Sequence, residues 1–75
     1  LPALVKVIEG EEPNSIKSQN ALYTVQQIFA EDWLKGVLYL EKASTESNNP
    51  NGSKRLQIAA QKTKTMWENL QKKMR

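Results

Sequence analysis

The residue types that carry most protein chemistry are absent from this chain or stand at unsuitable spacings. It has no Cys and no His, which excludes cysteine nucleophiles, Ser–His pairs, histidine acid–base groups and the usual zinc sites. Its only adjacent carboxylates are Glu11-Glu12 and Glu31-Asp32. Adjacent residues on a helix do not face each other, so neither pair forms a carboxylate dyad or a ready metal site. Three scattered Gly residues form no phosphate-binding loop, so we expect no enzyme, no cofactor and no metal.

The charged residues are divided unequally along the chain. Residues 1–52 carry four Lys and seven acids, a balance of −3, whereas residues 53–75 carry seven Lys or Arg and one Glu, a balance of +6. Such a basic segment suits phosphates or an acidic partner. Its cations spread around a helical wheel, with Arg55, Lys62 and Lys73 on one flank, Lys54 and Lys72 on the back, and Lys64 and Arg75 on the other flank. This dispersion favours a solvated helix face.

Residues 53–75 are predicted to form one long amphipathic helix that organises the domain. Ser53 is the expected N-cap. An apolar stripe follows the helical period, with Ala59 and Met66 on one shoulder; its members are Leu56, Ala60, Thr63, Trp67, Leu70 and Met74. The stripe is too short and diluted for a strong coiled coil, so we expect it to pack against the rest of the domain, with Trp67 in the core. A dimer remains an alternative.

Three shorter helices are predicted before it. The first starts at Pro2 and closes at Gly10 in a left-handed conformation, although its β-branched residues leave a strand open. The second is capped by Asn14 or Ser15 and runs to about residue 30. Its stripe is Ser18, Ala21, Leu22, Val25, Ile28 and Phe29.

A break near Glu31-Asp32 separates the second helix from the third. Asp32 is the expected cap, and the buried face of the third helix is Trp33, Leu34, Val37 and Leu40. A single helix over residues 15–43 is the alternative. Gly36 in this segment indicates either a close helix approach or a weak point.

Residues 44–53 are predicted to be a flexible loop, because they are polar and contain Pro50 and Gly52. The expected fold is therefore all-α, a small three- or four-helix bundle closed by the long C-terminal helix. The 75 residues make a single domain of marginal stability, and the absence of an initial Met suggests a piece of a longer protein. The longest apolar run, residues 37–40, is far too short for a membrane span.

Binding is the function that remains once catalysis is set aside. Trp33 is a candidate anchor, although it suits the core equally well. Ile58 on the polar back of the last helix and Tyr39 off the apolar face of the third are further candidates. The predicted partner-binding residues are Trp33, Tyr39, Ile58, Lys54, Lys62 and Lys72.

Two stretches resemble the helical N-terminal domain of the transcription elongation factor TFIIS, which elongin A shares and which the integrase-binding domain of LEDGF resembles. The first is Thr24-Val25-Gln26 followed by Leu34, Val37, Leu40 and Lys42; the second is Ala59-Ala60 through Met66-Trp67 to Leu70. The resemblance implies a nuclear adaptor that docks short motifs of transcription proteins. Arg55-Leu56 followed by Ala59-Ala60 and a Lys-rich end is also similar to the third helix of microtubule-interacting and trafficking domains, which bind amphipathic peptides in a groove between helices.

Three functions therefore compete. The chain is expected to be an intracellular docking module for a short motif or amphipathic helix of another protein. A nucleic-acid-binding domain that uses the basic last helix is the first alternative. A purely structural segment of a larger protein is the second.

Overall fold

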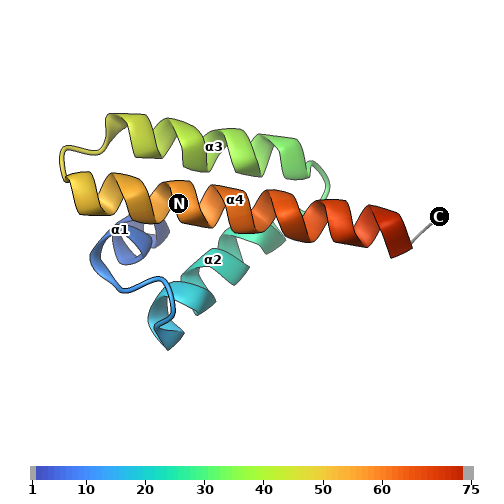
Figure 1. Cartoon of the computed structure of the whole chain (residues 1–75), viewed down its shortest axis with the longest axis horizontal. Helices are drawn as coiled ribbons and strands as arrows, with labels where there is room; N and C mark the ends of the chain where they lie inside the picture. The colour runs from blue at the N-terminus through green and yellow to red at the C-terminus, as the bar shows by residue number, and fades with distance from the viewer. Residues whose placement is uncertain (1, 74–75) are drawn as a thin grey trace.

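The computed structural model describes residues 2–73 and consists of four helices with no strand in that range. The helices are α1 (Pro2–Gly10), α2 (Ile16–Ile28), α3 (Trp33–Glu46) and α4 (Pro50–Lys73). In Figure 1, α3 runs antiparallel to α4 on one side, and α1 and α2 lie on the other. The 24 residues of α4 span about 36 Å and account for most of the 40 Å length of the molecule. The predicted all-α bundle closed by a long C-terminal helix is confirmed.

The break between the second and third helices is also confirmed. α2 ends at Ile28, two residues earlier than predicted, and α3 begins at Trp33. Asp32 caps α3, because its Oδ1 accepts a hydrogen bond from the Lys35 backbone N–H at 3.3 Å. Ser15 caps α2 in the same way, accepting from the Ser18 N–H at 3.1 Å.

The prediction of a flexible loop over residues 44–53 is wrong in its bounds, because only residues 47–49 connect α3 to α4. Ser44 is buried within α3, and its Oγ donates to the Ser53 carbonyl oxygen at 3.0 Å. Ser53 Oγ in turn donates to the Ser44 carbonyl at 2.8 Å. These reciprocal hydrogen bonds satisfy the polar groups of both side chains where α3 packs against α4.

The start of the last helix also differs from the prediction. α4 begins at Pro50, whose fixed φ suits a first helical position, so Ser53 lies inside the helix and does not cap it. Asn49 takes that role: its Oδ1 accepts from the Asn51 N–H at 3.0 Å, and its carbonyl accepts from the Ser53 N–H at 2.8 Å. Gly10 does not close α1 in a left-handed conformation, since no described Gly has a positive φ.

The core lies between the four helices, with α3 and α1 packed on α4 and α2 packed on α1. Ile8, Val25, Leu40 and Leu56 are its largest fully buried apolar side chains, one from each helix. Gly36 is buried on α3, and a Cβ at this position would lie 3.0 Å from the Cβ of Phe29. Gly36 therefore marks a close approach, but its neighbour is the side chain of Phe29, the C-cap residue of α2, and not another helix.

One polar pair is buried with the apolar core. Gln26 Nε2 donates to Thr63 Oγ1 at 3.1 Å, and Thr63 Oγ1 donates to the Ala59 carbonyl at 2.9 Å. Both residues are at most 7% exposed. Each buried polar side-chain atom in the described part of the chain has a partner, so the pair fixes the register of α2 on α4 without leaving a polar group unsatisfied.

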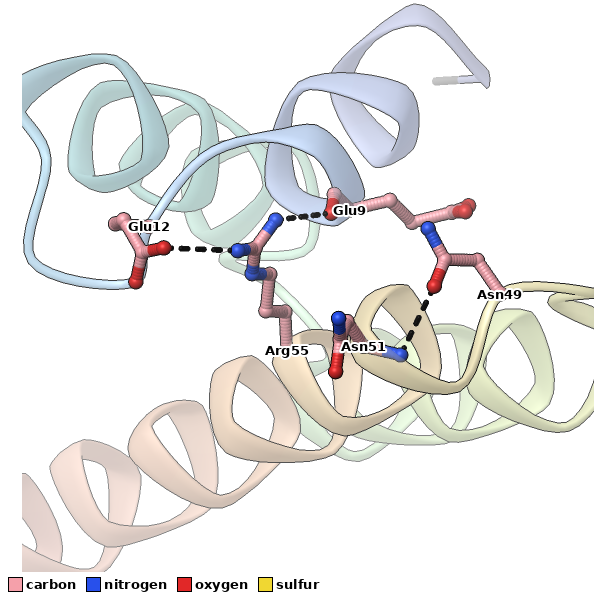
Figure 2. A network of polar contacts seen from close by, with 5 residues as sticks. All are labelled: Glu9, Glu12, Asn49, Asn51 and Arg55. Carbon is pink, nitrogen blue, oxygen red and sulfur yellow. Dashed lines mark hydrogen bonds and ion pairs between the residues drawn. The ribbon is translucent and has the colours of Figure 1, made fainter.

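Arg55 joins the first turns of α4 to the segment between α1 and α2 (Figure 2). Its Nη1 donates to the Glu9 carbonyl oxygen at 2.9 Å, which satisfies one of the backbone acceptors left open at the end of α1. Its Nη2 forms an ion pair with Glu12 Oε1 at 2.9 Å. Sequence analysis placed Arg55 among solvated cations, whereas its side chain is only 22% exposed.

Candidate functional site

The described residues offer no obvious chemical site. Among residues 2–73 there is no group of three or more Asp or Glu side chains that could hold a metal ion. No helix in the same range is long and apolar enough to cross a membrane. A functional site must therefore be sought in surface shape and in the apolar side chains that the fold leaves exposed.

The second half of α4 leaves its apolar stripe uncovered. Leu56, Ala60 and Thr63 are buried as predicted, but from Lys64 to Lys73 every residue except Trp67 is exposed. Figure 1 shows the reason: the red end of α4 extends past the start of α3. Trp67 is half-buried at this edge, so its predicted place in the core is wrong. Leu70 is 43% exposed and Met66 is 37% exposed, while Met74 lies outside the described residues.

A hollow of about 150 Å³ lies between α3 and α4, and both tryptophans line it. Its lining residues are Trp33, Leu34, Val37, Glu41, Lys64 and Trp67. Trp33 is half-buried and Leu34 is 64% exposed, so Leu34 does not belong to the buried face predicted for it. The volume is well below the roughly 300–1,000 Å³ of small-molecule sites and suits an inserted side chain better than a cofactor.

This hollow continues into a second one along the same pair of helices. The two share Val37, Glu41 and Lys64. The second hollow, of about 370 Å³, adds a polar lining: Ser44, Thr45, Gln57 and Gln61, with Ala60 at its base. Together the two hollows form one groove, called here the α3–α4 groove. From Gln57 to Trp67 it covers eleven residues of α4, a distance of about 15 Å along the helix axis.

The six residues predicted to bind a partner do not form one surface. Trp33 lines the α3–α4 groove. Tyr39 lines a different hollow between α1 and α3. The centroid of its ring lies 5.7 Å from the centroid of the Phe29 ring. Ile58 and Lys54 line a third hollow beside Glu12. Lys62 and Lys72 are exposed on α4. Whether any of the six contacts a partner stays a prediction.

Sequence analysis missed the other side chains that complete the groove. Leu34 and Glu41 are seven residues apart on α3, and Lys64 and Trp67 are three apart on α4, so each pair shares one side of its helix. Those spacings were visible in the sequence. What was not visible is which sides of the two helices face each other, because that depends on how α3 packs against α4.

The hollow around Tyr39 is larger, at about 420 Å³, but it makes a weaker candidate. Its rim has two Lys and two Glu, which are balanced in charge, and none of the strongly exposed large apolar residues lies in its lining. Leu34, by contrast, lines the α3–α4 groove, and Leu38 and Leu70 lie one helical turn from residues that line it. Exposed apolar area of a few hundred Å² is typical of surfaces that bind other macromolecules.

Comparison with known proteins finds no matching family model, no matching curated protein and no matching solved structure. The resemblance to the TFIIS N-terminal domain therefore stays an expectation from the sequence.

Proposed function

We propose that this chain is a non-catalytic docking module that holds a short segment of a partner protein in the α3–α4 groove. One observation supports the proposal most directly. Trp33 and Trp67 are both half-buried beside the 64% exposed Leu34, at an open edge of the bundle. Tryptophans that are partly desolvated before binding are frequent anchors of protein interfaces, since they add large apolar contact at little cost in side-chain entropy.

Nucleic-acid binding is the less favoured alternative. The exposed lysines of α4 lie on its flanks and back, and no described surface gathers them into a stripe. The Arg55 side chain already donates to the Glu9 carbonyl oxygen and to the Glu12 carboxylate. A phosphate backbone is bound by a row of cations at regular spacing, which this helix does not present.

The cellular setting follows only from the resemblances. A TFIIS-like module implies a nuclear adaptor of transcription proteins, and a trafficking-type module implies an intracellular peptide-binding role. Both are peptide-docking functions, so either is compatible with an apolar groove between helices.

Affinity capture from cell extract tests the proposal when matched surface variants are compared. We expect Leu34→Glu to abolish capture of protein partners, because it places a charge at the apolar end of the groove. Ile16→Glu is the control, since Ile16 is 76% exposed on α2 and does not line the groove. Partners should survive nuclease and moderate salt with the wild-type chain and with Ile16→Glu.

Two results would contradict the proposal. Partners that bind Leu34→Glu as well as the wild type would show that the groove is not the docking surface. Loss of all partners on nuclease treatment, with binding that falls steeply with salt, would assign the function to nucleic acid. Trp33→Ala should also abolish capture, but its unfolding must be measured in parallel because Trp33 is half-buried.

A further inference from the structure

The α3–α4 groove changes in chemical character along its length. At one end the lining is apolar, with Trp33, Leu34 and Trp67. At the other end it is made of hydroxyl and amide side chains, with Thr45, Gln57 and Gln61 among them. A ligand that follows this groove must therefore be apolar at one end and polar at the other, which gives it a single favoured direction.

Opposite charges face the groove from its two walls at the point where the two hollows overlap. Glu41 lies on the α3 wall and Lys64 on the α4 wall, and both are exposed. The only ion pair within residues 2–73 joins Arg55 to Glu12, so Glu41 and Lys64 do not neutralise each other across the gap. A ligand that lies between the two helices therefore has the negative Glu41 side chain on one side and the positive Lys64 side chain on the other.

The dimensions suit a helix. The groove is bounded by two antiparallel helices and covers about 15 Å, which corresponds to about ten residues or three turns of helix. An added helix that lies along two packed helices buries its apolar face in the manner of helix-in-groove recognition. The 150 Å³ hollow at the tryptophan end then receives one large side chain from the first turn of that face.

We infer that the ligand of the α3–α4 groove is an amphipathic helix of about three turns from another protein. It carries a bulky apolar anchor for the tryptophan end, with an acidic residue facing Lys64 and a basic residue facing Glu41 near its middle. This inference rests on the proposed docking function and specifies the partner. Charge complementarity at this point sets which partner helices fit and in which direction they lie.

Selection from a phage-displayed library of helical peptides of about twelve residues tests the inference. The library is selected separately on the wild-type chain, on Lys64→Glu and on Glu41→Lys. Peptides selected on the wild type should share an apolar anchor and an acidic position. That position should become Lys or Arg on Lys64→Glu, whereas the basic position should become acidic on Glu41→Lys.

Affinities of the selected peptides make the result quantitative. A wild-type-selected peptide should bind Lys64→Glu about threefold to fivefold more weakly, the range expected for an exposed ion pair. The charge-reversed peptide should restore that affinity. Lys73→Glu is the matched control, because Lys73 is exposed on α4 and lines neither hollow of the groove, so the same charge change is made outside it. Circular dichroism checks that each variant remains helical.

The possible failures are distinguishable. Peptides that bind the groove but whose charges do not respond to Lys64→Glu or Glu41→Lys would overturn the inference and leave the docking function standing. Failure to select any peptide, or selection of peptides that bind Leu34→Glu equally well, would overturn both. If light scattering shows a dimer that Leu34→Glu converts to a monomer, the ligand is a second copy of this chain and the inference is wrong.

Discussion

The two halves of α4 have the same apolar period, but the apolar face is buried in the first half and exposed in much of the second. In the first half Leu56 is fully buried and Thr63 is 2% exposed, while in the second half Leu70 is 43% exposed. The difference arises because α2 ends at Ile28 and α3 begins at Trp33, so neither covers the last turns of α4. A helical apolar stripe thus predicts which face of a helix is buried. It does not predict how far along the helix the other helices of this domain cover that face.

The cations of α4 divide differently, because Arg55 is fixed whereas Lys54 and Lys62 in the same half are exposed. Arg55 in the first half is held by a backbone carbonyl and a carboxylate from the segment around the end of α1. The lysines of the second half are exposed. The first half of α4 therefore contributes to folding with its apolar side chains and with Arg55, whereas the apolar side chains of the second half are left exposed or half-buried.

Truncation of equivalent leucines gives the largest expected contrast. Leu56→Ala removes a fully buried side chain that lies against the other helices, and we expect it to lower the free energy of unfolding by about 3–5 kcal/mol. That is most of the stability of a domain this small. Leu70→Ala should cost less than about 0.5 kcal/mol. Urea unfolding followed by circular dichroism measures both, and equal losses would show that the second half of α4 is packed in solution.

Removal of a hydroxyl group tests the buried polar pair. Thr63→Val keeps the side-chain shape but leaves the Gln26 amide without its partner in the core, which should cost about 1–3 kcal/mol. Thr65→Val is the matched control two residues further along α4, where the side chain is exposed, and it should stay within about 0.5 kcal/mol of wild type. If the two variants unfold at the same urea concentration, the Gln26–Thr63 bond does not contribute to stability.

Neutralisation of single cations gives the smallest effect. Arg55→Gln should cost about 1 kcal/mol, mainly through loss of the bond to the Glu9 carbonyl. The Glu12 side chain is 79% exposed, so the ion pair itself adds little. Lys62→Gln, its control on the same flank of the helix, should leave the unfolding midpoint unchanged. A difference between the variants that vanishes in 1 M NaCl would mean instead that the ion pair supplies the stability.

Much of the fold was predictable because its signals are local. Ser15 and Asp32 cap their helices through their own side chains, and the apolar periods of α2 and the first half of α4 follow 3.6 residues per turn, although Ile28 of the predicted α2 stripe is 53% exposed. The connection between α3 and α4 was not predictable on the same basis. Ser44 and Ser53 resemble loop residues in the sequence, but they bond to each other across packed helices.

The candidate site was less predictable than the fold. Trp33 was identified as a possible anchor, but Leu34 and Trp67 were assigned to the core and Glu41 and Lys64 were given no role. Tyr39 and Ile58 were grouped with Trp33 as candidate contacts, because Trp33 is bulky and follows the break before α3, whereas Tyr39 and Ile58 lie off the apolar faces of their helices. In the structure they line three separate hollows, since residues that share a type do not share a surface until the helices are placed.

The sequence by itself determined that this chain is helical, where three of its helices begin or break, and that its last helix is amphipathic and basic. These properties depend on interactions within a few residues, between a cap and the next turn or between side chains three and four apart. Only the tertiary structure decided that half of the apolar stripe is left open and that Glu41 faces Lys64 across a groove. Those outcomes depend on where α2 ends and α3 begins relative to α4, a balance of packing contacts between residues distant in the chain.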